Sequence, residues 1–531
     1  MRLSWRCDPG RALTMLVACA SMALLTGCQG GGGAVQATGH RMRIDLRWHG
    51  QEPDLYEIWR GDRAEGPFER IADQHGVPLY TDFVGQDGIS RYYRVRTVKP
   101  STGTGDGSEF GAFSATVEGR SVAEDREAFL TGVQEAGIRY FFDFAHPVSG
   151  LAREWGRQTP PRHVRRICAI GASGMGLMNL VVGLERGVLP AVETRELLLR
   201  MLTFVQEQAE TYDGALPHWM DGTTGKTIPF AKIGGADIVE TAFFMEGVLV
   251  VREYFSGANK LDRQIRSRAD ELWRGVRWDR FTDEKNRLYW HWPVEGLKRP
   301  MRITGSNEGH IAYLLAVASP THPAPDEVYS QGWVGTHRVM NKAFYGMHLE
   351  VGRPHGSPLF WTHYSYLGLD PHGLQDKHVT DYFTYHRNVA LIHWEYAKEN
   401  PKAHAGYGPL RWGLTSSSGP DGYGPWTPVR HDNGTIAPTA ALSSMPYVPE
   451  QSLAMLEDLY EKRGGHLWGE FGFYDAFNDS RNWVSKGFWI GIDVGPIAPM
   501  IENHRTGLCW KLFMNAPEIK AAVERLGIAE K

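Results

Sequence analysis

The stretch GGADIVETAFFMEG, residues 234–247, has the apolar spacing of a buried helix but carries three acidic side chains. Asp237 and Glu240 stand three residues apart and therefore lie on one helix face. That face continues with apolar residues, so it is the face that packs inward. Glu246 lies opposite Asp237 at 3.6 residues per turn, and we expect it to face solvent. Two like charges on the inward face need an explanation.

Two structural roles could account for this pair of acids. Asp237 suits the N-cap or first turn of the helix, where the helix dipole favours negative charge. Alternatively, the acids form a buried ion pair with a distant basic residue. A functional role requires further acids elsewhere in the chain that could share a cleft with this helix.

The same helical spacing recurs through most of the sequence after about residue 124. Long loops rich in Gly, Pro, His and Trp separate the helical segments, whereas ordinary helix bundles have short loops. Paired helices with long loops at one end favour an α/α toroid whose loops build a cleft. The predicted helices cover residues 125–145, 174–189, 194–212, 237–255, 264–278, 308–320, 381–400 and 449–463.

One glycine-rich motif within this region resembles a nucleotide-binding loop. ICAIGASGMG, residues 167–176, resembles a dinucleotide or phosphate loop after a strand. No Gly-Lys-Ser/Thr follows it, and the surrounding pattern is helical instead of βαβ. We therefore interpret these glycines as small residues that allow two helices to pack closely.

Residues 41–120 have a different pattern. Short alternating runs such as RMRIDLRW (41–48) and SRYYRVRTV (90–98) are separated by Gly, Pro and Asp turns and predict β-strands. The second run resembles a late strand of a fibronectin type III sandwich. We predict a small all-β sandwich at 41–120 that folds separately from the helical region and serves as a spacer or docking module.

The N-terminus has the features of an exported lipoprotein. Three arginines precede an apolar run that fits a signal peptide and is short for a membrane span. The run ends in LLTGCQG, which resembles a bacterial lipobox, so we expect residues 1–27 to be removed and Cys28 to be lipidated. Gln29 is typical of an outer-membrane destination, facing the periplasm or the cell surface. Residues 28–40 read as a flexible tether. An ordinary cleaved signal is the alternative.

Composition narrows the classes of partner. A formal net charge of -4 lacks the basic excess typical of nucleic-acid binding. Cys168 and Cys509 are the cysteines that remain after Cys28, so one disulfide can form but no disulfide framework. His378, His386 and His393 are spaced for different helix faces, and no HExxH motif is present. We predict no metal, no cofactor, a monomer, and membrane contact only through the lipid anchor.

Further acids interrupt the pattern on other segments. Glu308 stands at the start of the sixth predicted helix with Ser306 as its N-cap, Asp475 lies among aromatic residues in GEFGFYDAFN, and Asp493 follows an apolar run in GFWIGIDVGP. Each alone is explained as a first-turn or turn-forming acid. Together with the acids of 234–247 they supply what glycoside hydrolysis needs: one carboxylic acid protonates the leaving oxygen and a second carboxylate activates water or attacks the sugar. Crowding and burial would keep one of them protonated near neutral pH.

Aromatic and histidine side chains gather in the loops. The chain has 18 Trp, 21 Tyr and 22 Phe. Core packing explains any single Trp, but Trp beside His in a Gly/Pro loop favours a platform for flat apolar ligand faces such as sugar rings. The predicted substrate-binding residues are His218, Trp219, His291, Trp292, Trp361, His363, Tyr364, Arg387, Trp412, Tyr423 and Trp426.

Several of these motifs occur in the order typical of one protein family. YFFDFAHPVSGLAREW, GALPHWMDGTTGK, ADIVETAFFMEG, SNEGHIAYLLAVASPTHP, RWGLTSSSGPDGYGPW and GEFGFYDAFN follow one another along the chain. Over residues 125–525 the sequence resembles the glycoamylase-like family of (α/α)6-barrel proteins, especially the bacterial endo-β-1,2-glucanases of glycoside hydrolase family 144. The resemblance implies an all-α (α/α)6 barrel and an inverting, endo-acting hydrolase that cuts linear or cyclic β-1,2-glucan to sophoro-oligosaccharides.

The resemblance also assigns roles to the acids. Asp237, Glu240 and Glu308 match the acidic positions clustered in the family's cleft. We expect Glu308 to be the general acid, although a position at a helix start favours the ionised form. Asp475 or Asp493 is the expected base, and the remaining acids bind sugar hydroxyls or tune the acid.

Other functions remain as alternatives. One is a transglycosylase, or a hydrolase of another glucan linkage, on the same barrel. A second is a non-catalytic surface lipoprotein that captures glycans, although a binder of neutral sugars has little need of several carboxylates. Lyase chemistry ranks lower, because it needs a uronic substrate.

Overall fold

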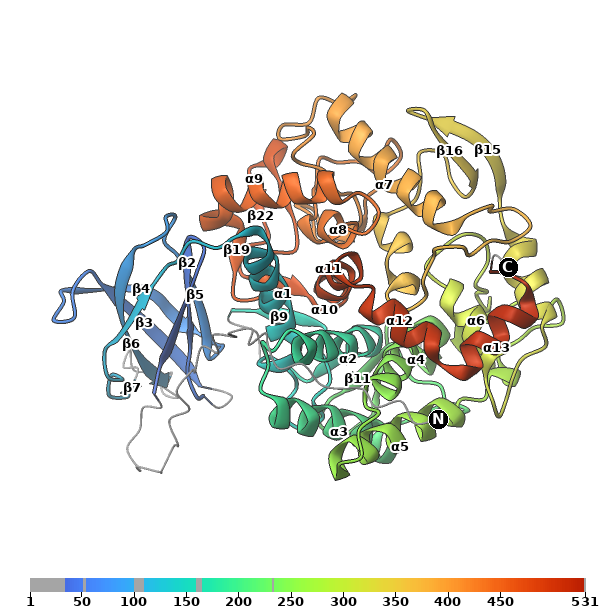
Figure 1. The fold of residues 1–531 in the computed structure, drawn as a ribbon, viewed down its shortest axis with the longest axis horizontal. Coiled ribbons are helices and arrows are strands. Elements are labelled where there is room, and N and C mark those ends of the chain that lie inside the picture. Colours follow the sequence, from blue (N-terminus) through green and yellow to red (C-terminus); the bar gives the residue numbers. More distant parts are fainter. Residues whose placement is uncertain (1–33, 51–53, 100–108, 159–164, 232–233, 530–531) are drawn as a thin grey trace, which may run out of the picture.

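The computed structural model describes residues 34–50, 54–99, 109–158, 165–231 and 234–529. A β-rich region, blue in Figure 1, lies against one side of a larger helical region. The predicted signal peptide at 1–27 and Cys28 lie outside the described residues. No helix in the described part of the chain is both long enough and apolar enough to cross a membrane.

Two antiparallel sheets form the β-rich region and enclose a common apolar core. One sheet has the order β1 (Gln36–His40), β2 (Arg43–Arg47) and β5 (Leu79–Phe83). The other has the order β4 (Phe68–His75), β3 (Leu55–Gly61), β6 (Ser90–Lys99) and β7 (Glu109–Phe110), and β8 (Val117–Arg120) also pairs with β6. The core between them consists of Ile44, Leu46, Trp48, Tyr56, Ile58, Tyr93 and Val95.

The end of the predicted tether is wrong. Residues 36–40 form β1, which pairs along its whole length with β2. The chain reverses between these strands at Met42, whose φ is 59°. The sequence pattern did not predict this strand because the residues before it are rich in Gly. The strand is stabilised by pairing with β2 and not by the composition of its own residues.

Helices make up most of the chain from residue 126 onward. They are α1 (Arg126–Phe142), α2 (Ile170–Glu185), α3 (Ala191–Gln208), α4 (Ile238–Tyr254), α5 (Lys260–Gly275), α6 (His310–Ala318), α7 (Tyr382–Glu399), α8 (Pro438–Ser443), α9 (Pro449–Leu467), α10 (Gly491–Val494), α11 (Ile497–Arg505), α12 (Leu508–Asn515) and α13 (Pro517–Leu526). All eight predicted helical segments are present. The sequence did not predict α8 or the helices from α10 to α13.

Short strands in the loops tie the starts of these helices together. The pairs are β9 (Trp155–Arg157) with β23 (Phe488–Ile490), β10 (Ile167–Ala169) with β11 (Trp219–Asp221), β11 with β12 (Thr227–Ile228), and β13 (Ala236–Asp237) with β14 (His291–Trp292). Further hairpins are β15 (Val339–Phe344) with β16 (Met347–Val351), β17 (Ser416–Ser417) with β18 (Gly424–Pro425), β19 (Trp468–Gly469) with β20 (Gly472–Phe473), and β21 (Phe477–Asn478) with β22 (Trp483–Val484).

Helix α4 lies at the centre of the helical region. It packs against α2, α5, α6 and α12, and every residue from Ile238 to Arg252 is buried. The expectation that Glu246 faces solvent is therefore wrong. Its carboxylate is fully buried and accepts hydrogen bonds from the N–H groups of Gly368 at 2.7 Å and Leu369 at 3.2 Å. The helical-wheel argument assumed one covered face, whereas α4 is covered on all sides.

The glycine motif of residues 167–176 serves helix packing, as predicted. A Cβ on Gly174 would stand 2.2 Å from the carbonyl oxygen of Phe243, and one on Gly247 would stand 2.1 Å from that of Gly174. These distances are too short for any side chain, so α2 and α4 touch backbone to backbone. Nearby, Cys168 is buried and free, as is Cys509.

The β-rich region is packed onto the helical region. Arg43 of β2 is fully buried and donates hydrogen bonds to the hydroxyl of Tyr460 at 2.9 Å and the carbonyl of Gly132 at 3.2 Å. Its guanidinium also lies 5.1 Å from the centre of the Trp468 ring. This buried interface contradicts a sandwich that is joined to the helices only through a linker.

Candidate active site

The acids of the opening stretch lie at the start of α4, and Asp237 has two roles. Its Oδ1 caps the helix by accepting hydrogen bonds from the N–H groups of Val239 at 3.0 Å and Glu240 at 3.2 Å. Its Oδ2 turns away from the helix and lies 2.9 Å from Nδ1 of His218. The same side chain therefore caps α4 and contacts His218, so the capping explanation is confirmed and the functional one stays a prediction.

Glu240 is held by the start of a second helix. Its Oε2 accepts a hydrogen bond from the N–H of Gly171 at 2.7 Å, and its Oε1 lies 3.8 Å from Nδ1 of His218. A Cβ on Gly171 would stand 2.4 Å from that Oε2, so this approach requires glycine. Burial raises the pKa of Glu240 to about 7; the charge of His218 opposes the rise, and the charge of Asp237 adds to it.

His218 is the cation of this group. Burial favours its neutral form, but the charges of Glu240 and Asp237 outweigh burial and raise its pKa to about 9. Its ring stacks on Phe230, with centroids 3.9 Å apart and planes 13° apart. On the other side of Asp237, Nδ1 of His291 lies 3.9 Å from the same Oδ2, and burial lowers the pKa of that histidine.

Glu308 lies just before α6 instead of inside its first turn. The helix begins at His310, and Ser306, the predicted N-cap, instead bonds to Nδ1 of His337 at 3.0 Å. Oε2 of Glu308 is buried and has no hydrogen-bond partner among the described residues. Burial, together with the charges of Asp237 and Glu240, raises the pKa of Glu308 to about 8. The acid is therefore protonated at neutral pH.

Asp475 and Asp493 form a second carboxyl pair. Oδ2 of Asp475 accepts a hydrogen bond from the N–H of Ser418 at 2.7 Å, and Oδ1 of Asp493 accepts one from the hydroxyl of Tyr364 at 3.0 Å. Burial raises the pKa of both aspartates. The neighbouring Asp475 raises the pKa of Asp493 further, well above its usual range, and a hydrogen bond between them leaves the proton on Asp493.

Glu154 belongs to the same cluster and was missed in the sequence. It precedes β9, and its carbonyl accepts a hydrogen bond from the N–H of Gly491 at 2.9 Å, two residues before Asp493. Burial raises its pKa, opposed by the charge of His218. Its charge in turn acts on both His218 and Asp493, so it links the two carboxyl pairs. The available signal was an acid directly beside Trp155 in a loop.

Aromatic rings surround this carboxylate cluster, which consists of Glu154, Asp237, Glu240, Glu308, Asp475 and Asp493. Trp219 lies edge-on to Trp155 at 5.4 Å and to Phe230 at 5.0 Å. Tyr423 leaves 63 % of its surface exposed while its hydroxyl approaches Ser416. The predicted binding residues that the structure brings to the cluster are His218, Trp219, His291, Tyr364 and Tyr423.

Trp361 and Arg387 have less direct positions. The Trp361 ring lies 5.2 Å from the guanidinium of Arg353, whose charge acts on Glu308. Trp361 also lines a pocket of about 20 Å³ together with Ser306, the residue two before Glu308. Arg387 is exposed on α7.

The structure gives the other predicted binding residues contacts of their own. Trp412 is fully buried, and His363 is buried with its Nε2 2.9 Å from the hydroxyl of Ser444. Trp292 donates its indole N–H to Asp213 at 2.8 Å. Trp426 packs under its own hairpin, against Gly419 and Gly424. A substrate-binding role for these residues stays a prediction.

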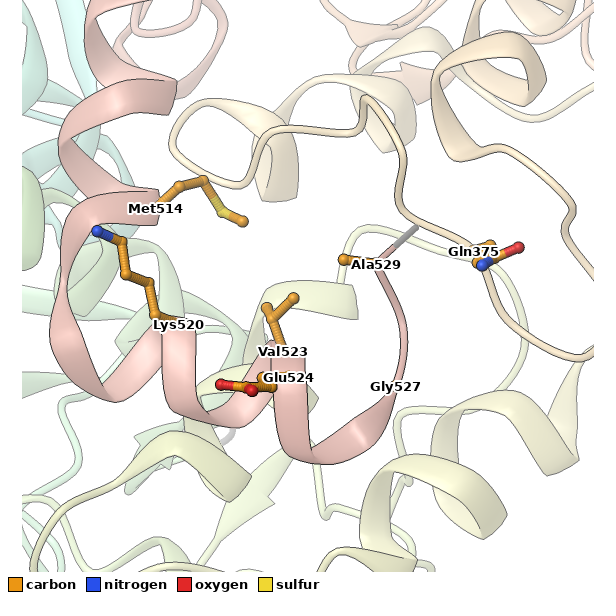
Figure 2. Close-up of a pocket in the computed structure, with 7 residues that line it drawn as sticks. All are labelled: Gln375, Met514, Lys520, Val523, Glu524, Gly527 and Ala529. Carbon is orange, nitrogen blue, oxygen red and sulfur yellow. The ribbon is translucent and has the colours of Figure 1, made fainter. Parts of the chain in front are cut away.

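One cavity is separate from the cluster. It measures about 920 Å³ and lies beside α12, α13 and the end of the chain (Figure 2). None of the clustered carboxylates lines it. The residues that do are Gln375, Met514, Lys520, Val523, Glu524, Gly527 and Ala529. The perturbed carboxyls, and not this cavity, are therefore the candidate catalytic position.

Comparison with known proteins agrees with this geometry. A family model described as "Putative glucoamylase" matches residues 300–517. The exo β-1,2-glucooligosaccharide sophorohydrolase (non-reducing end) of Parabacteroides distasonis is 38% identical over 518 residues, covering 92% of this chain and 70% of that protein. The crystal structure of a β-1,2-glucanase from the same organism superposes with a TM-score of 0.86 at 36% identity, covering 93% of this chain and 72% of that one.

A third relative matches only part of this chain. The endo-β-1,2-glucanase of Chitinophaga pinensis, solved with sophorotriose and glucose, has a TM-score of 0.73 and 42% identity. It covers 76% of this chain and is itself covered to 98%. The fold and the carboxylate cluster define a glycoside hydrolase. The chain belongs to the glycoamylase-like family of such enzymes.

Proposed function

We propose that this enzyme hydrolyses β-1,2-linked glucans and gluco-oligosaccharides. The observation that carries the proposal is the carboxylate cluster, in which burial and the charges of Asp237 and Glu240 raise the pKa of Glu308 to about 8. The substrate class rests on the relatives, which act on β-1,2-glucans by name and match this chain over most of its length. The helical region is proposed to be an (α/α)6 barrel, with the cluster at the end where α2, α4 and α6 begin.

The proposed reaction inverts the anomeric carbon. Glu308 gives its proton to the glycosidic oxygen as the C1–O bond breaks. A water molecule on the opposite face forms the new C1–O bond and gives its proton to the pair of Asp475 and Asp493. Within that pair Asp475 is the proposed base, because Asp493 holds the shared proton and the N–H of Ser418 stabilises an ionised Asp475.

The proposed mode of attack is exo, with release of a disaccharide from a chain end. The exo-acting relative matches 92% of this chain, so the match extends into the β-rich region. The endo-acting relative matches 76%, a share similar in size to the helical region alone. Endo cleavage, the expectation from sequence, remains the second candidate because that relative is 42% identical where it aligns.

Product analysis tests both candidates. The enzyme is incubated with linear β-1,2-glucan, and products are separated by chromatography at early times, with Glu308→Gln as the control. Exo action gives sophorose from the first time point, and endo action gives a ladder of intermediate lengths. Redistribution of lengths without new reducing ends would indicate a transglycosylase. No reaction on β-1,2-glucan would overturn the proposed substrate.

The proposed location is the outer membrane, through a lipid on Cys28. The lipobox motif supports this proposal, and an acyl chain contributes about 0.8 kcal/mol per buried CH₂. Membrane fractionation of the wild type and Cys28→Ser tests it. Release of the variant into the soluble fraction, with unaltered chemistry, is the expected result. Retention of both proteins in the pellet after a salt wash would reject the anchor.

A further inference from the structure

His218 occupies the centre of the carboxylate cluster. Its Nδ1 lies 2.9 Å from Asp237 and 3.8 Å from Glu240, both on α4. Glu154, from the segment before β9, acts on it from another element. The remaining titratable neighbour is His291 of β14, whose pKa burial lowers, so it stays neutral. His218 is therefore the one cation that the described residues place against these three acids.

The position of His218 is fixed from several directions. Phe230 covers one face of its ring at 3.9 Å. Its carbonyl accepts a hydrogen bond from the N–H of Ile170 at 3.2 Å, next to Gly171, whose N–H holds Glu240. Two consecutive residues at the start of α2, Ile170 and Gly171, thus fix the backbone of His218 and the carboxylate of Glu240. The side chain keeps 23 % of its surface exposed, while those of its two α4 partners keep 3 % and 7 %.

We propose that His218 is a positioning residue: its Nδ1 holds the side chains of Asp237 and Glu240 beside each other at the start of α4, and through these two acids it favours the protonated form of Glu308. Both α4 carboxylates act directly on Glu308, and Arg353 opposes them. Without the cation, two buried like charges would stand three residues apart on one helix, and one of them would take up a proton. This role goes beyond that of a sugar platform, and the activity part of its test rests on the proposed function.

The expected consequence is a changed pH profile. In His218→Gln, Glu240 keeps a proton to higher pH, because the charge that favoured its ionised form is gone. With less negative charge beside it, Glu308 then gives up its proton at lower pH, so the basic limb of kcat/KM on linear β-1,2-glucan moves down by at least one pH unit. The loss of activity relative to wild type becomes at least tenfold larger at pH 8 than at pH 6. A loss of the same size at every pH would overturn the proposal, because a merely structural role predicts that result.

A matched control comes from another histidine–aspartate pair. His372 lies 2.7 Å from Asp370 on the exposed surface, so His372→Gln removes a similar ion pair outside the cluster. Its pH profile should keep the wild-type limbs. Thermal melting of both variants confirms that each is folded at the pH values used.

A second measurement needs no substrate. Selective histidine labelling and NMR follow the titration of the His218 ring in the full chain, assigned by its absence in His218→Gln. We expect the ring to remain protonated at pH 8 and to titrate at least one unit lower in Asp237→Asn. A His218 that is neutral at pH 7 overturns the inference, even if the glucan proves to be the substrate. Conversely, failure to hydrolyse β-1,2-glucan would refute the proposed function and leave this titration as the decisive test.

Discussion

The two carboxyl pairs of the cluster respond differently to the same burial. Asp237 and Glu240 share a histidine cation and accept hydrogen bonds from three helix-start N–H groups. Asp475 and Asp493 have one N–H, one tyrosine hydroxyl and no cation among the described residues. The first pair can therefore carry negative charge, whereas the second keeps a proton. Partners, more than burial, decide which buried acid is ionised, and this difference separates the roles of acid, base and electrostatic neighbour.

Removing the acid that stands beside the first pair has the largest expected effect. Glu308→Gln should lower kcat on linear β-1,2-glucan by about 10²–10⁴-fold, because the amide has no proton to give to the leaving oxygen. Folding and glucan binding should change little, since the side chain keeps its shape. Kinetics and thermal melting measure both, with the exposed Glu295→Gln as control. Turnover near that of wild type would mean that another carboxyl is the acid.

Substitutions within the second pair should be unequal. Asp475→Asn removes the proposed base and should cost about a hundredfold or more in kcat. Asp493→Asn should cost about tenfold, because an amide N–H can replace the proton that this residue already donates. Each variant should keep its melting temperature. The reverse order of effects would make Asp493 the base.

Removing a hydrogen bond to the pair of Asp475 and Asp493 should have a smaller effect on activity. Tyr364→Phe removes the hydroxyl that donates to Asp493 at 3.0 Å, and the loss of such a bond costs about 1–3 kcal/mol. We expect a decrease of about tenfold in kcat/KM. The measurement is a pH profile beside that of the wild type. Unchanged activity would show that the proton shared by the pair does not depend on this bond.

Substitution of Glu246, a buried acid outside the carboxylate cluster, should have the smallest effect, and this effect should be on stability instead of activity. Burial raises its pKa to about 8 in the folded protein, while the unfolded chain has an ordinary value near 4.5. Its stabilising contribution is therefore full below about pH 4.5 and decreases as pH rises through 8. Glu246→Gln should remove this dependence and melt above the wild type at pH 9, with unchanged kcat. A wild type that remains the more stable at pH 9 would contradict a protonated Glu246.

The sequence predicted the helical segments well because periodicity reports local geometry. It also selected five of the six clustered acids, each of which interrupts an apolar pattern. Glu154 was not predicted because its segment has no periodic apolar pattern that an acid could interrupt. Glu246 was misplaced for the opposite reason: its helix has a period, but the surrounding helices cover every face.

The aromatic predictions show a further limit. A Trp in a loop has the same sequence signature whether it lies beside the carboxylate cluster, as Trp219 does, or is buried in the core, as Trp412 is. The N-cap assigned to Ser306 failed because its hydroxyl has a partner 31 residues away, in His337. Which of two local bonds a side chain makes depends on contacts that are distant in sequence.

The buried guanidinium of Arg43 has a consequence for how the enzyme unfolds. Arg43 joins β2 to the side chains of Tyr460 and Trp468 in the helical region. Unfolding of the helical region would leave the charge of Arg43 unpaired, and unfolding of the β-rich region would expose the two aromatic rings, so neither region can unfold alone without a cost in free energy. Calorimetry should therefore record one cooperative transition instead of two. A version trimmed to begin at α1 would present those rings to water and associate with itself. The β-rich region and the helices are thus expected to unfold as one cooperative unit.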